Sequence, residues 1–225
     1  MRTFLRGIST VLIAIGVLLL ADVGITLVWQ EPVSAIYARV EQARLADRLE
    51  AMEAVPVTTV ERRVLERLPK GAPRLGFAAR SLRRRAEDGS PVGRLRVPKI
   101  GLDDVIIEGT GAGDLRRGPG HYPDTPLPGA RGTVAVAGHR TTYGAPFRRL
   151  DRLDRGDRIE VLMPYGRFTY EVERTRIVAP TALWVTRRVR HDRLVLTACH
   201  PLYSAAQRIV VFARLAASVP RGPVA

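Results

Sequence analysis

The sequence predicts a mainly β protein, with a closed or nearly closed β-barrel and short helices behind an N-terminal transmembrane helix and a helical stalk. Eight short runs rich in β-branched residues follow position 92, and Gly, Pro and Asp separate them. Short runs at this spacing favour a barrel over an alternating βαβ fold. The runs span residues 94–97, 105–107, 133–137, 158–162, 168–173, 175–178, 193–197 and 207–213.

Composition limits the classes of protein. The chain has 225 residues, 46% of them hydrophobic, which is enough to bury a core in one domain or two small ones. The single cysteine excludes an internal disulfide framework and any metal site built from several cysteines. The net charge of +14 suits nucleic acid, an anionic membrane or an acidic wall polymer. Because only Lys70 and Lys99 are lysines, we interpret the charge mainly as the arginine usage of a high-GC genome.

Residues 7–29 are the predicted transmembrane anchor. A helix over this range is about 34 Å long at ~1.5 Å per residue, which spans a hydrocarbon core of about 30 Å. Asp22 interrupts the apolar run, but it lies toward one end, where a charge costs less than at the centre. Arg2 and Arg6 precede the run and favour a cytoplasmic N-terminus, and Trp29 suits the membrane interface. A cleaved signal peptide is the alternative, although no small-residue cleavage site follows the apolar core at once.

The segment 30–90 is predicted to be a juxtamembrane helix and linker. Apolar spacing over 33–53 indicates an amphipathic helix, which suits a stalk better than a membrane-surface or partner helix. Pro56, Pro69 and Pro73 indicate a flexible linker over 54–90, with a solvated basic run at 83–85. The predicted division is 1–6 cytoplasmic N-terminus, 7–29 anchor, 30–90 helix and linker, 91–217 β-barrel domain and 218–225 tail.

Three reactive side chains stand at the ends of apolar runs. His139 follows the run 133–138, Cys199 follows 194–198, and Arg208 precedes 209–212. In a barrel, strand ends meet at a rim, so residues far apart in sequence can converge there. A cysteine nucleophile needs an imidazole to favour its thiolate, and its tetrahedral intermediate needs a cationic or N–H donor. Each residue alone has a structural explanation, and only their joint placement indicates acyl transfer.

These placements resemble the sortases, membrane-anchored cysteine transpeptidases of Gram-positive bacteria with an eight-stranded barrel. The segments that carry the resemblance are Ala137-Gly-His-Arg140, Leu196-Thr-Ala-Cys199 and Arg208-Ile-Val-Val211, and it covers roughly residues 92–215. Further segments resemble class E, the housekeeping sortases of actinobacteria: Gly118-Pro-Gly-His-Tyr-Pro123, Gly138-His-Arg-Thr-Thr-Tyr-Gly-Ala-Pro-Phe147 and Cys199-His-Pro201.

The resemblance implies a role for each residue. Cys199 would attack the Thr–Gly carbonyl of a Leu-Ala/Pro-x-Thr-Gly sorting signal and form a thioacyl enzyme. His139 would protonate the departing amine and later deprotonate the incoming one, while Arg208 holds the oxyanion or the substrate backbone. An amine of a peptidoglycan cross-bridge or lipid II would resolve the intermediate. The partners are therefore surface proteins with C-terminal sorting signals and a wall precursor, and we expect no cofactor. We expect no metal because the sequence has no metal-binding motif, and no nucleic acid because the basic run lies outside the membrane and lacks interleaved aromatic residues.

Tyr122, Thr197 and Ala198 are the expected substrate-binding residues. The resemblance places Tyr122 beside the second residue of the signal, where class E is associated with Ala over Pro. Ala198 stands where the family's Thr-Leu-x-Thr-Cys strand has its second threonine. The hydroxyl beside the nucleophile is therefore missing, and we expect altered efficiency or specificity and not a loss of the reaction.

Alternatives remain at the level of both residues and function. His121, His191 and His200 compete with His139 for the role of base, and Arg214 competes with Arg208. The rival functions are a pilin-polymerising sortase and a non-catalytic, membrane-tethered barrel that binds the wall. A papain-like peptidase is disfavoured, because its cysteine precedes its histidine.

Overall fold

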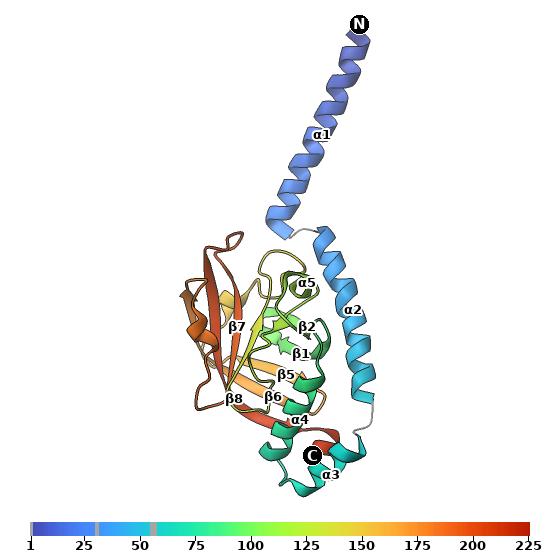
Figure 1. The fold of residues 1–225 in the computed structure, drawn as a ribbon. Coiled ribbons are helices and arrows are strands. Elements are labelled where there is room, and N and C mark those ends of the chain that lie inside the picture. Colours follow the sequence, from blue (N-terminus) through green and yellow to red (C-terminus); the bar gives the residue numbers. More distant parts are fainter. Residues whose placement is uncertain (1, 30–31, 55–57) are drawn as a thin grey trace.

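The computed structural model describes residues 2–29, 32–54 and 58–225 (Figure 1). Helix α1 (Arg2–Trp29) extends away from the rest of the protein, and its stretch Arg6–Gly24 has a mean hydropathy of 2.2 with none of it buried. Length and composition make it a candidate membrane span, a test that a signal sequence also passes. The side chains of Arg2 and Trp29, on which the predicted orientation and interface position depend, lie outside the described part.

Eight strands close into the predicted barrel, in the order β1-β2-β3-β4-β7-β8-β6-β5. The strands are β1 (Pro91–Val97), β2 (Leu102–Glu108), β3 (Gly120–His121), β4 (Thr133–Ala137), β5 (Arg158–Met163), β6 (Gly166–Val178), β7 (Arg193–His200) and β8 (Gln207–Pro220). The short helices between and after them are η1 (Pro98–Ile100), α5 (Ala112–Leu115), η2 (Leu150–Arg152), η3 (Leu183–Thr186) and η4 (Gly222–Val224). The barrel closes because β5 pairs with β1 as well as with β6.

The strand count agrees with the sequence prediction, although the strands are not the same eight runs. The runs 168–173 and 175–178 are both part of β6, where a register shift against β8 between Val172 and Arg174 accounts for the apparent break. The eighth strand is β3, which has only two residues and pairs with β2 and β4. So short a strand leaves no hydrophobic pattern in the sequence.

Alternate residues along β4, β7 and β8 face opposite sides of the barrel wall, as the pleat of a strand requires. The inward residues join the main core, and the outward ones form a second apolar cluster that includes Val185 of η3. The inward set includes Val134, Val136, Leu194, Leu196, Ile209 and Val211, and the outward set is Ala135, Val195, Val210 and Phe212. The outer wall at these three strands is therefore apolar and covered in part by the β6–β7 connection.

Helix α2 (Pro32–Ala54) lies against the barrel beside β1 and β2 and does not form a free stalk (Figure 1). Leu45 and Leu49 are buried in a cluster with Val105 and Ile107 of β2. The Gln42 amide accepts from the Val105 N–H at 2.6 Å and donates to the Val105 carbonyl at 3.2 Å. The Gln42 side chain thus bonds both backbone groups of Val105, as a neighbouring strand would, and this fixes the position of α2 relative to β2. The barrel covers only part of the predicted apolar side, since Leu45 and Leu49 are buried whereas Val33, Ile36 and Val40 are exposed.

The segment 54–90, interpreted above as a flexible linker, contains two helices that pack on the barrel. Helices α3 (Thr59–Arg67) and α4 (Ala72–Arg85) bury Leu65, Leu75, Ala79 and Leu82 in the main core. The prolines mark helix boundaries: Pro69 lies between the two helices, and Pro73 lies in the first turn of α4, where no intrahelical N–H bond is lost. Pro56 lies outside the described residues.

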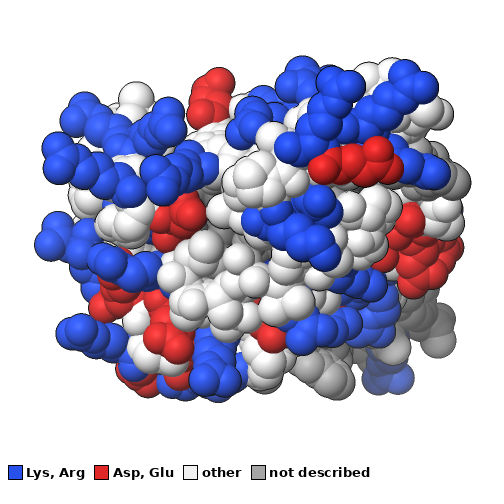
Figure 2. Space-filling view, turned by 90° about the horizontal axis from the view of Figure 1, so that it is seen from below, with Lys and Arg blue, Asp and Glu red and all other residues white. Residues whose placement is uncertain are grey.

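The basic side chains on one face of the molecule are spread around its edge. Figure 2 shows the face opposite α1, where basic groups surround an uncharged centre and acidic groups lie among them. Members of the basic run 83–85 have defined partners, since Arg85 pairs with Glu61 and Arg83 lies 3.6 Å from Glu108. This run is thus part of the folded domain and not a mobile basic tail.

We predict that Leu49→Ala lowers the free energy of unfolding by about 2–4 kcal/mol, because it leaves a cavity between α2 and β2. Met52→Ala on the exposed side of the same helix is the control and should cost far less. Urea unfolding of the full-length protein in detergent micelles, followed by circular dichroism, measures both. Equal unfolding midpoints for wild type and Leu49→Ala would show that α2 does not contribute to the folded domain.

Candidate active site

Strand β7 lies between β4 and β8 and brings the three predicted catalytic residues to one end of the barrel. β4 and β7 are parallel, and their pairing ends at Ala137 opposite Thr197. His139 and Cys199 are each two residues beyond that pair. On the other side, the antiparallel β7–β8 pairing sets Cys199 directly opposite Arg208. The end of β7 that carries Cys199 faces the α1 end of the molecule in Figure 1.

The alternation of side chains sorts these residues between the two sides of the wall. Cys199 and Thr197 follow Val195 on the outward side, and Arg208 precedes Val210 on the same side. Cys199 is partly exposed and is a free thiol. Ala198 is buried in the main core, so the structure does not bring its side chain to the face that carries Cys199. Any contact of Ala198 with a substrate would therefore use its backbone.

His139 begins a loop that folds back onto the end of β4. The Phe147 N–H donates to the His139 carbonyl at 3.0 Å, and the ring of Phe147 is fully buried. A Cβ at Gly138 would lie 2.7 Å from this ring, so glycine is required for the loop to close. The sequence Gly138 to Phe147 is thus a closed loop anchored at both ends, which holds His139 at the barrel rim.

The environment of His139 favours a neutral imidazole. Its ring is partly buried and lies 5.2 Å from the ring of Tyr143, and the Arg116 guanidinium lies 5.7 Å from the same tyrosine ring. Burial lowers the pKa of His139, and the positive charge of Arg116 lowers it further. A neutral imidazole can accept a proton from a thiol, which is the first step that a cysteine nucleophile needs.

Arg208 is held at the start of β8 by backbone carbonyls. Its Nη1 donates to the carbonyls of Ala205 and Gln207, both at 2.9 Å. Its competitor Arg214 is bound to Glu173 at 2.7 Å, opposite Arg193 at the far end of the β7–β8 pairing. The structure thus brings Arg208, and not Arg214, to the end of the barrel that carries Cys199.

Tyr122 reaches the same outward side from the segment after β3. Its hydroxyl lies 3.0 Å from the hydroxyl of Thr197, and its ring packs against the outer apolar cluster. A buried polar network holds this segment: the hydroxyl of Thr125 donates to the Tyr122 carbonyl, and His121 contacts Thr125 at 3.0 Å and Glu108 at 2.8 Å. The side chain of His121 is therefore engaged in this network and does not face the candidate site.

The other two histidines have different positions. His191 precedes β7 and so lies at the opposite end of that strand from Cys199. His200 follows Cys199 directly, but its Nδ1 lies 2.9 Å from Nη1 of Arg140, which is 3% exposed. The sequence offered no reason to assign a role to Arg140, Tyr143 or Arg116. Nothing in a single sequence distinguishes these arginines from the many others.

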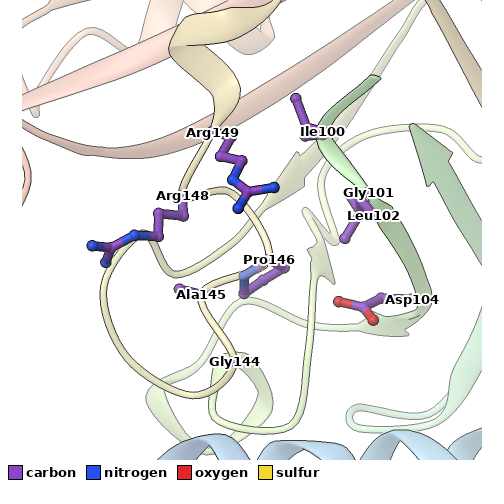
Figure 3. Close-up of a pocket in the computed structure, with 9 residues that line it drawn as sticks. All are labelled: Ile100, Gly101, Leu102, Asp104, Gly144, Ala145, Pro146, Arg148 and Arg149. Carbon is purple, nitrogen blue, oxygen red and sulfur yellow. The ribbon is translucent and has the colours of Figure 1, made fainter. Parts of the chain in front are cut away.

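A pocket of about 210 Å³ lies between the start of β2 and the later part of the His139 loop (Figure 3). The Asp104 carboxyl points from β2 toward this loop. Burial raises the pKa of Asp104 to about 6, and the charge of neighbouring Asp103 adds to the shift. None of the predicted site residues lines this pocket, which is therefore separate from the candidate site. Within the described ranges, no three His, Cys, Asp or Glu side chains lie close enough to hold a metal ion.

Comparison with known proteins agrees with this arrangement. The chain is 38% identical to sortase D of Bacillus subtilis over 57% of its own length and 65% of that protein, and 30% identical to sortase E1 of Streptomyces coelicolor over 60% and 43%. It therefore spans less than two thirds of the length of these curated relatives. The class E expectation is supported only in part, since the higher of these two identities belongs to a class D sortase.

Solved structures show the same fold. Sortase E of Streptomyces avermitilis superposes with a TM-score of 0.55 at 32% identity and covers 60% of this chain and 93% of its own. A sortase D5 transpeptidase of Clostridium perfringens gives a TM-score of 0.63 over 79% of this chain and 99% of its own, and at 21% identity it supports the fold alone. The family model described as Sortase domain matches residues 95–216, more than half of the chain and nearly the whole barrel. The protein belongs to the sortase family.

Proposed function

We propose that this protein is a cysteine transpeptidase that cleaves a Leu-Ala/Pro-x-Thr-Gly sorting signal between Thr and Gly and transfers the protein to an amine of a cell-wall precursor. One observation carries the proposal. Cys199 is paired with Arg208 on β8, and it lies at the same distance beyond the β4–β7 pairing as His139. A thiol, an imidazole and a guanidinium at one end of the barrel are the groups that acyl transfer needs.

The proposed reaction has two halves. The neutral imidazole of His139 takes the proton of the Cys199 thiol, and the thiolate attacks the threonine carbonyl of the signal. The guanidinium of Arg208 stabilises the oxyanion, and the imidazolium gives its proton to the departing glycine amine. The incoming amine then attacks the thioester, loses its proton to His139 and releases Cys199, so that one amide bond replaces another.

The substrate would lie along the outer wall of the barrel. The apolar cluster of Ala135, Val195 and Val210 continues from Cys199 under the β6–β7 connection, and Tyr122 borders it. We propose that the apolar leading residue of the signal packs here and that the paired hydroxyls of Tyr122 and Thr197 face its second residue. With α1 as anchor, and Arg2 and Arg6 before it, the barrel would lie outside the cell.

The test of function is a transfer assay. The full-length protein in detergent should convert a Leu-Ala-x-Thr-Gly peptide and triglycine into the transfer product, and hydroxylamine should capture the acyl group. We expect Cys199→Ala to abolish the reaction and Arg208→Ala to reduce kcat about 100-fold, which is the usual cost of losing an oxyanion donor. Arg214→Ala, on the same face of β8 but at its far end, is the control and should keep near-wild-type activity.

Two results would contradict the proposal. If wild type forms no acyl-enzyme with either the alanine or the proline peptide and behaves like Cys199→Ala, the chain is a non-catalytic barrel. If Arg208→Ala and Arg214→Ala have the same rate, Arg208 does not act in the reaction.

Tyr122→Phe should change the choice between signal peptides. Loss of the hydroxyl breaks the contact with Thr197, and a hydrogen bond of about 1 kcal/mol corresponds to roughly a fivefold effect. We expect kcat/KM for the alanine peptide to fall about fivefold relative to the proline peptide. Tyr165→Phe removes a buried hydroxyl that binds the Pro128 carbonyl and is the control for stability. An unchanged peptide ratio in Tyr122→Phe would remove this hydroxyl from the specificity site.

Arg116→Gln should raise the pKa of His139. The guanidinium disfavours the imidazolium, so its removal makes the ring easier to protonate and moves the acid limb of kcat/KM to higher pH. A histidine-selective NMR titration measures the pKa, and the pH dependence of acylation measures the kinetic effect. Arg117→Gln, whose guanidinium pairs with Asp114, is the control. A lower or unchanged pKa in Arg116→Gln would show that this charge does not act on His139.

A further inference from the structure

Arg140 and His200 connect the two strand ends that carry the proposed catalytic pair. Arg140 follows His139 directly, and His200 follows Cys199 directly. The guanidinium Nη1 of Arg140 lies 2.9 Å from Nδ1 of His200. Because a guanidinium only donates, Nδ1 of His200 must accept, which places the ring proton of neutral His200 on Nε2.

This contact continues the β4–β7 pairing after the backbone ladder ends. The last backbone bond runs from the Gly138 N–H to the Thr197 carbonyl at 3.1 Å. The two strands pair with a constant offset from Thr133–Arg193 to Ala137–Thr197, and Arg140–His200 has the same offset. His139 and Cys199 thus lie between the last backbone hydrogen bond and the Arg140–His200 hydrogen bond. The two chain segments are therefore held together both before and after this pair of residues.

The guanidinium is itself held in place. It is 3% exposed, its Nη2 pairs with Asp151 of η2 at 3.1 Å, and its Nε donates to the Arg148 carbonyl at 3.4 Å. A buried cation is tolerated only when it is paired and hydrogen-bonded, and here three segments supply the partners. The planar fork of arginine can reach acceptors in three directions, which a lysine ammonium cannot reproduce.

We propose that Arg140 is a positioning residue, which sets the approach of the His139 imidazole to the Cys199 thiol by bonding to Nδ1 of His200. The proposal rests on the proposed function, in which this pair exchanges a proton. Proton transfer between them needs hydrogen-bond reach, and a displacement of about 1 Å can cost up to roughly 100-fold in rate. Neither Arg140 nor His200 needs to touch the substrate for this effect.

The test compares His200→Ala with His200→Asn in the full-length protein. The amide oxygen of asparagine can take the place of Nδ1 as acceptor, whereas alanine offers none. We expect His200→Ala and Arg140→Met to lower kcat at least about tenfold with KM within about twofold, because positioning fails while binding persists. His200→Asn should recover most of kcat, and the double variant Arg140→Met/His200→Ala should be no slower than the slower single variant.

Arg148→Met is the control. Its guanidinium joins the same two segments by donating to the Tyr203 hydroxyl at 3.2 Å, but farther along the chain from His139 and Cys199. It should keep kcat within about twofold of wild type. Thermal unfolding of every variant separates positioning from stability, and if Arg140→Met does not fold, the two His200 variants decide.

A second readout does not need turnover. We expect iodoacetamide to alkylate Cys199 at a rate that His139→Ala reduces, and His200→Ala should reduce it similarly while His200→Asn does not. A wild type without transfer product would overturn the proposed function and leave this alkylation test valid. The positioning role is overturned if folded His200→Ala keeps wild-type kcat and alkylation, if His200→Asn is as slow as His200→Ala, or if Arg148→Met is equally slow.

Discussion

The parallel pairing of β4 with β7 is the constraint on which the candidate site depends. Parallel strands end on the same side of a sheet, so His139 and Cys199 lie at the same end of the barrel although they are far apart in the chain. The β7–β8 hairpin then returns directly and sets Arg208 opposite Cys199. A shift of this pairing by one residue would turn Cys199 into the core and Ala198 outward. Close packing of the inward residues on both strands therefore fixes the register of the pairing, and with it the outward position of Cys199.

The two sides of the barrel wall have different surroundings. Inward residues of β4, β7 and β8 fill the main core together with α3 and α4, while outward residues form the apolar surface beside Cys199. This separation explains why Ala198, which departs from the family pattern, is accommodated: its methyl group lies in an apolar core where a hydroxyl would need a partner. Loops held by buried polar groups, such as Thr125 and Arg140, carry the remaining site residues.

Local patterns in the sequence predicted the barrel and the positions of its long strands, because each buries one side and alternates. They also led to His139, Cys199 and Arg208, which end or begin such strands. These local patterns failed where contacts between distant segments determine which residues are buried. The prolines near α3 and α4 led to the prediction of a flexible linker. That prediction was wrong because Leu75 is buried by strands that are distant in the sequence, which a local pattern cannot show. Glu108 is buried against His121, and no local pattern in the sequence indicates such a pairing. The Arg140–His200 contact is likewise non-local.

The docking of α2 changes the mechanics of the molecule. Only two residues separate the end of α1 at Trp29 from the start of α2 at Pro32, and α2 is fixed along β2 by Gln42 and Leu49. A free linker of the predicted length would let a domain sample a wide volume, whereas two residues extend at most about 7–10 Å. With α1 in the bilayer, the barrel has a short tether and a small working radius. A barrel tethered in this way would stay close to the membrane surface.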